Sequence, residues 1–196
     1  MTATFSEFAQ SLTAESAFTV LAIAKKLKAA GKDVVELEIG DSPFNSPKSA
    51  IATGLQAIED NVSHYCPSPG LPEFRKAAAK FVKDEFGIPA EMENVAVGPG
   101  AKIFEQFFCE AFLSPNDGVL VFSPHFPTYP PNIWRRGARM VLKPLTQANQ
   151  FRPQLSDIED FLNEDPSPKA IFLNSPHNPT GGITTEDDLR GIADLI

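Results

Sequence analysis

The first half of the chain carries apolar residues at the spacing of amphipathic helices. Apolar side chains recur three or four positions apart in residues 18–28, 48–60 and 71–86, with polar residues between them. This spacing places the apolar side chains on one face of a helix and predicts helices over these three segments. A short apolar run over residues 34–39, which ends at Gly40, predicts a strand.

Beyond residue 94, short apolar runs alternate with amphipathic segments. The runs predict strands over residues 94–97, 119–122, 139–142 and 170–173, and the segments predict helices over residues 101–113, 129–136, 155–162 and from residue 186 onward. Thr184 and Asp187 stand where the two ends of a capping box would begin the last helix. Such an alternation is typical of an α/β fold with a mostly parallel sheet and helices on both faces.

The composition is that of an ordinary globular chain. Of its 196 residues, 42% are hydrophobic and 21% are charged, and the net charge is −8. An acidic chain is a poor partner for nucleic acid and for anionic lipid, so we expect neither. Cys66 and Cys109 share no CxxC spacing, so we expect no disulfide scaffold and no metal site. Free cysteines favour a reducing, cytoplasmic location. No apolar run approaches the ~18 residues of a membrane-spanning helix.

The sequence stops at Ile196, inside a predicted helix and without a capping residue. A natural domain seldom ends in the middle of a helical turn. We therefore expect this sequence to be the front part of a longer protein. The alternative is a terminal helix that ends early.

A glycine-rich turn stands between a predicted strand and a predicted helix. It reads Gly98-Pro-Gly-Ala-Lys102, and the amides of Ala101 and Lys102 would be free donors at the helix N-terminus. Such amides suit an anion such as a phosphate. The turn matches neither GxGxxG nor the P-loop pattern. The alternative interpretation is a tight strand–helix turn with no ligand.

Two further loops follow predicted strands and carry candidate side chains. In residues 123–129, Phe126 could present its face to a flat ligand ring, or it could belong to the core. In residues 174–182, two prolines fix the path of the chain, and Asn178 offers a donor and an acceptor at a defined place. The alternative for Asn178 is an Asx-type turn. His177 has no acidic partner or nucleophile at a spacing that would support catalysis.

Two positions in the first half precede or follow rigid turns. Gly40 follows a predicted strand, and its amide could receive a carboxylate, although the segment also reads as a simple turn. Tyr65 precedes a proline-rich loop, and Arg75 lies in the helix after it. By itself, Arg75 reads as a solvated or salt-bridged surface residue.

Five motifs in this order resemble the class I and II aminotransferases, which are pyridoxal-phosphate enzymes of fold type I. The motifs are Gly40-Asp-Ser-Pro-Phe44, Tyr65-x-x-x-x-Gly70-x-x-x-Phe-Arg75, Gly100-Ala-Lys102, Pro124-x-Phe-x-x-Tyr129 and Asn174-x-Pro-x-Asn-Pro-Thr-Gly181. The Asn-Pro-Thr-Gly motif in its strand–loop setting is the most specific. The resemblance implies an incomplete large domain in residues 48–196, preceded by an N-terminal arm and a helical part of a small domain in residues 1–47.

The resemblance implies pyridoxal 5'-phosphate as cofactor and assigns residues to it. Gly100, Ala101 and Lys102 form the turn whose backbone amides hold the cofactor phosphate. Phe126 stacks on the pyridine ring, where the family carries an aromatic side chain, and Asn178 hydrogen-bonds the phenolic oxygen. These implied roles agree with the chemistry that each loop offers by itself.

The resemblance also implies substrates and a quaternary state. Gly40 helps to hold the α-carboxylate of the substrate, and Tyr65 reaches across a dimer interface to the phosphate of the partner. The implied reaction moves an amino group from an amino acid to a 2-oxo acid in a homodimeric enzyme. The substrate amino acid is not specified.

Three groups that the family uses for chemistry have no counterpart in this sequence. They are the Asp at the pyridine nitrogen, the Schiff-base lysine and a distal Arg. Lys102 belongs to the phosphate turn, and Lys169 opens a predicted strand. We therefore assign no catalytic residue and expect the chain by itself to be inactive as a transaminase. Decarboxylases, carbon–sulfur lyases and synthases of fold type I share these loops and remain alternatives. So does a non-catalytic domain that binds a phosphate-bearing ligand.

Overall fold

The structure, a computed structural model, describes residues 4–12 and 16–196. The chain falls into two compact units. One, the sheet unit, comprises residues 1–12 and 100–196, and the other, the helical unit, comprises residues 13–99. The division expected at residue 47 does not coincide with this one, and it stays a prediction about domains.

The helical unit contains the three helices that the apolar spacing predicted. They are α2 (Ser16–Ala29), α3 (Lys48–Glu59) and α4 (Pro72–Phe86), and a short 3-10 helix, η1 (Met92–Asn94), follows them. The strands predicted over residues 34–39 and 94–97 were wrong, because these residues pair with no neighbouring strand, and Asn94 belongs to η1. A short apolar run is compatible with either an unpaired extended segment or a strand, and only a partner decides between them.

Arg75 is not the solvated surface residue that the sequence suggested. It is half-buried on α4, where its Nε donates to the carbonyl of Val95 and its Nη2 donates to that of Met92, both at 2.8 Å. A second bond holds the same segment, since the amide of Val97 donates to the carbonyl of Pro69 at 2.9 Å. The guanidinium therefore replaces the missing strand partner for residues 92–97.

The sheet unit is built on three parallel strands in the order β2-β1-β3. They are β1 (Gly118–Ser123), β2 (Arg139–Pro144) and β3 (Pro168–Phe172), and they confirm three of the predicted strands. The chain leaves β1 through α6 (Tyr129–Arg135) to reach β2 on one side, and passes through η2 (Gln147–Asn149) and α7 (Leu155–Glu164) to reach β3 on the other. The carboxyl end of β1 is thus a topological switch point, the place where open α/β sheets bind ligands.

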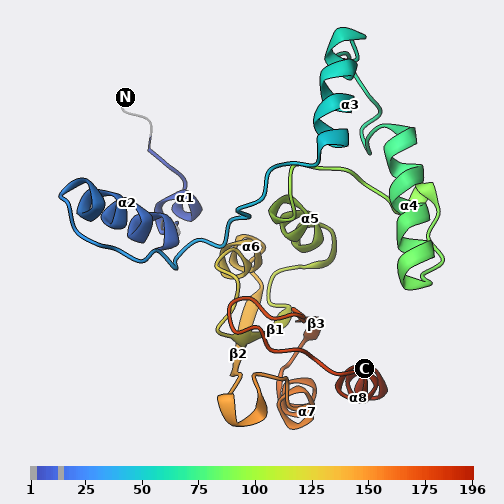
Figure 1. Ribbon diagram of the computed structural model, residues 1–196. Coiled ribbons are helices and arrows are strands. Elements are labelled where there is room, and N and C mark those ends of the chain that lie inside the picture. Colours follow the sequence, from blue (N-terminus) through green and yellow to red (C-terminus); the bar gives the residue numbers. More distant parts are fainter. Residues whose placement is uncertain (1–3, 13–15) are drawn as a thin grey trace. The chain divides into compact units, whose positions relative to one another are not determined.

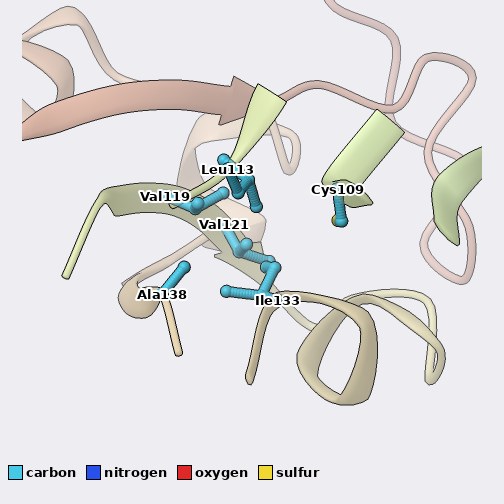
Figure 2. Packing of buried hydrophobic residues seen from close by; sticks show 6 residues of the cluster. All are labelled: Cys109, Leu113, Val119, Val121, Ile133 and Ala138. Atoms are coloured by element: carbon cyan, nitrogen blue, oxygen red, sulfur yellow. The ribbon is translucent and has the colours of Figure 1, made fainter. Parts of the chain in front are cut away.

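Helices cover both faces of this sheet, as the alternation of strands and helices predicted (Figure 1). On one face lie α5 (Lys102–Phe112) and α6, and on the other lie α7 and α8 (Glu186–Leu195). The first face buries Cys109, Leu113, Val119, Val121, Ile133 and Ala138. Figure 2 shows Val119 and Val121 of β1 among these residues. The second face buries Leu120, Phe122, Leu145, Ile158, Phe161 and Ile192.

The last helix begins at Glu186, as predicted, but its capping box lies one residue later than the sequence suggested. The capping box is formed by Thr185 and Asp188, whose side chains each accept a bond from the other's backbone amide. The assignment to Thr184 and Asp187 was therefore wrong by one position. Both pairs contain Thr and Asp at the right separation, so spacing alone did not distinguish them.

An ion pair fixes the amino end of the sheet. Arg139 at the start of β2 forms two bonds of 2.7 Å to the carboxylate of Asp165, whose side chain is 4% exposed. The same carboxylate accepts the amide of Ser167, just before β3. The Arg139 guanidinium holds the pKa of Asp165 below its ordinary value. The amino end is therefore closed by a charge-assisted contact, and the loops at the carboxyl end carry the candidate chemistry.

Candidate functional site

The candidate phosphate turn ends at an uncapped helix N-terminus. Gly100 has a φ of +80°, and a Cβ placed on it would meet nothing within 4 Å. Helix α5 begins at Lys102, and no described side chain caps its start at Ala101. The first amides of a helix have no acceptor within the helix and carry its positive partial charge. The start of α5 is therefore positively polarised, which suits an anion.

Phe126 lies next to this turn. Its ring is half-buried and belongs to neither core cluster, and the Nζ of Lys102 lies 5.4 Å from its centroid. Phe126 also contacts Tyr129: the two ring centroids lie 6.0 Å apart, and the ring planes meet at 61°. Tyr129 in turn packs edge-on against Phe172 of β3 at 5.1 Å. The ring of Phe126 is thus supported by Tyr129, which packs on the sheet, and is contacted by the ammonium of Lys102.

Asn178 occupies the turn of the loop after β3. Its backbone amide donates to Oδ1 of Asn174 at 2.8 Å, and its side chain is exposed. This bond spans four residues, so it is not the Asx-type turn that the sequence offered as the alternative, in which the side chain accepts from the amide two residues on. Because Asn174 satisfies the backbone, the amide group of Asn178 is left to project from a fixed loop.

His177 is the buried member of the same loop, with 8% exposure. Its Nδ1 lies 2.7 Å from Oγ1 of Thr180, and its backbone amide donates to the carbonyl of Gly182 at 2.8 Å. Burial lowers the pKa of His177, while a hydrogen bond to the backbone of Pro124 raises it in part. His177 therefore joins the loop after β3 to the loop after β1, a tie that the sequence did not indicate.

A second tie joins the loop after β1 to helix α5. The hydroxyl of Thr128 donates to the carboxylate of Glu105, and both side chains are half-buried. Burial and then the charge of Glu105 raise the pKa of Tyr129. Neither Glu105 nor Thr128 stands in a motif, and only the fold brings them together.

Cys109 does not contribute a nucleophile to this region. Burial, followed by the charges of Glu105 and Glu110, raises the pKa of its thiol to about 11. A thiol with such a pKa stays protonated near neutral pH and is unreactive. Over residues 4–12 and 16–196, there is also no group of three or more His, Cys, Asp or Glu side chains placed to hold a metal ion.

Gly40 and Tyr65 belong to the helical unit. Gly40 lies in an extended, exposed segment after α2, and a Cβ placed on it would meet nothing within 4 Å. The side chain of Tyr65 is fully exposed, at 108% of its reference area. The sheet unit by itself brings Lys102 and Phe126 together and joins the Asn178 loop to the Phe126 loop. The roles assigned to Gly40 and Tyr65 stay predictions.

No helix in the described part of the chain has the length and apolar character needed to cross a bilayer.

The family model for aminotransferases of class I and II matches residues 32–196. The probable aspartate/prephenate aminotransferase of Rhizobium leguminosarum bv. phaseoli is 34% identical over 175 residues, which cover 88% of this chain and 43% of that protein.

Solved structures give the same result. Aspartate aminotransferase from Thermus thermophilus with maleate matches with a TM-score of 0.92 and 28% identity, over 99% of this chain and 50% of that one. Alanine aminotransferase from Pyrococcus furiosus matches with a TM-score of 0.89 and 28% identity, over 98% of this chain and 49% of that one. The chain thus spans about half the length of the relatives that it matches. On its motifs, its fold and these matches, the chain belongs to the class I and II aminotransferases.

Proposed function

We propose that this chain forms the N-terminal half of a pyridoxal-phosphate-dependent aminotransferase. The observation that carries the proposal is the uncapped start of α5 next to the ring of Phe126. A flat ring that carries a phosphate needs an anion site and an aromatic surface close together, and these residues fit such a group. The position at the switch point of the sheet supports the same site.

The residues of the sheet unit divide the binding between them. In this proposal the amides of the turn formed by Gly100, Ala101 and Lys102 hold the phosphate, and the open space beside Gly100 leaves room for it. Phe126 supports the ring, and the exposed amide group of Asn178 hydrogen-bonds the phenolic oxygen. When bound, pyridoxal phosphate supplies the electron sink that amino-group transfer requires.

The remaining parts of the proposal concern the whole protein. Gly40 holds the substrate carboxylate, and the exposed ring of Tyr65 reaches the phosphate of a second subunit in a homodimer. Residues 1–47 form an arm and part of a small domain, and residues 48–196 form the first part of the large domain. The enzyme is cytoplasmic and takes an amino acid and a 2-oxo acid. Two similar proteins are named for different amino acids, aspartate and alanine, so their names favour no single substrate.

Pyridoxine phosphate is a suitable probe of the site. It has the ring and the phosphate but no aldehyde, so it cannot form Schiff bases with surface lysines. We expect the 196-residue chain to bind it at least about tenfold more tightly than pyridoxine, because the helix N-terminus adds charge-assisted bonds. Phe126→Ala should weaken binding of pyridoxine phosphate about tenfold by removing the aromatic surface. Phe112→Ala, at an exposed phenylalanine of the same unit, is the matched control and should leave the affinity for pyridoxine phosphate unchanged. Calorimetric titration measures these affinities, and equal affinity for the two probes would contradict the site.

The reaction itself is tested with the protein made from its complete reading frame. We expect it to move ¹⁵N from a labelled amino acid to a 2-oxo acid, detected by mass spectrometry. The 196-residue chain alone should show no transfer, because it contains no residue assigned as the Schiff-base lysine or as the acid at the ring nitrogen. Release of carbon dioxide or free ammonia in place of transfer would instead assign a decarboxylase or a lyase and contradict the proposal.

A further inference from the structure

A side-chain hydrogen bond joins two elements of the candidate site. Glu105 lies in the first turn of α5, one helical turn after Lys102. Thr128 lies in the loop after β1, two residues after Phe126. The hydroxyl of Thr128 donates to the carboxylate of Glu105. The bond therefore connects the helix that starts at the phosphate turn with the loop that carries the ring of Phe126.

Other residues of the loop after β1 contact the sheet and the loop after β3. The backbone of Pro124 lies close enough to the imidazole of His177, in the loop after β3, to influence its pKa. Tyr129 packs against Phe172 of β3 and against the core on the α5–α6 face of the sheet. These contacts fix the loop relative to the sheet, whereas the bond of Thr128 fixes it relative to the start of α5.

The spacing between these two elements matters for a ligand that needs both. Ring and phosphate are joined covalently, so their separation in the ligand is nearly constant. A site that binds both groups must match this separation closely, because a misplacement of about 1 Å already weakens binding or reaction substantially. An ion that needs the helix N-terminus alone does not depend on the spacing.

We propose that Glu105 and Thr128 are a positioning pair that sets the distance between the phosphate turn and the ring of Phe126. The inference rests on the proposed cofactor site. The pair touches no ligand in this proposal and acts through α5 and the loop after β1. The burial of both side chains supports it, since a half-buried hydrogen bond to a carboxylate is shielded from competition by water.

Thr128 is the residue to change, because its substitution leaves the charge near the anion site unaltered. Thr128→Val keeps the shape and removes the hydroxyl, and Thr128→Ser keeps the hydroxyl. The probes are pyridoxine phosphate, which needs both elements, and inorganic phosphate, which needs the turn alone. We expect Thr128→Val to lower the affinity for pyridoxine phosphate about fivefold or more. The affinity for inorganic phosphate should fall less than about twofold. Thr128→Ser should stay within about twofold of the unchanged chain for both probes.

The pattern of affinities separates the possible outcomes. Equal losses for the two probes in Thr128→Val would mean general loosening of the fold and would overturn the proposal, as would no loss at all. A Thr128→Ser variant as weak as Thr128→Val would also overturn it, because the hydroxyl would then be irrelevant. If the unchanged chain binds inorganic phosphate but not pyridoxine phosphate, or binds neither, the proposed function fails and this inference falls with it.

Discussion

Replacing His177 with alanine is expected to lower the free energy of unfolding of the sheet unit by about 2–4 kcal/mol. The imidazole is 8% exposed, so its removal leaves a cavity. It also removes the bond to the hydroxyl of Thr180 within the loop and the contact with the backbone of Pro124 in the loop after β1. Urea unfolding measures the loss. His64→Ala, at an exposed histidine, is the matched control and should change stability by less than about 0.5 kcal/mol.

The same residue makes stability depend on pH. Burial keeps the pKa of folded His177 below the ordinary value of 6.5. Below that ordinary value the unfolded chain binds the proton more readily than the folded one. The contribution of His177 is therefore complete above pH 6.5 and is lost as the pH falls through the lowered pKa of the folded state. Unfolding measured between about pH 7.5 and pH 5.5 should show this loss, and His177→Ala should reduce it. If the free energy of unfolding of His177→Ala depended on pH as steeply as that of the unchanged chain, His177 would not be the group responsible.

The sheet and its helices could be predicted from the sequence because their signals are local. Apolar runs around Val119 and Val121 and the amphipathic pattern of α7 are set by residues that are neighbours in the chain. The predictions that failed depend on contacts between residues that are far apart in the sequence. Residues 34–39 and 94–97 have strand-like composition, yet whether such a run pairs depends on a partner elsewhere in the fold. At residues 92–97 that partner is the side chain of Arg75.

The candidate site divides in the same way. The motifs pointed to Lys102, Phe126 and Asn178, because each stands at a turn whose residue types already suggest a ligand. The bond between Thr128 and Glu105 spans 23 positions, and His177 meets Pro124 across two different strands. No spacing rule relates residues that only the folding of the sheet brings together. The residues that we propose as ligand contacts therefore came from the sequence, and the residues that tie the surrounding loops together could not be predicted from it.

Gly70→Ala is expected to destabilise the helical unit by about 2–4 kcal/mol. Gly70 is buried and has a φ of +110°, a conformation that residues with a Cβ rarely adopt. A Cβ at this position would lie 2.7 Å from both Cβ and Cγ2 of Val97. Because the Cβ of Val97 is fixed to the backbone, relief requires residues 95–97 to move. The bond from the amide of Val97 to the carbonyl of Pro69 would then lengthen or break.

The matched control is Gly54→Ala in the middle of α3. A Cβ at Gly54 would meet nothing within 4 Å, and alanine favours a helix interior over glycine by about 0.5–1 kcal/mol. The two identical substitutions should therefore change the urea midpoint in opposite directions. A Gly70→Ala variant as stable as the unchanged chain would show that residues 95–97 yield without cost and would contradict the prediction.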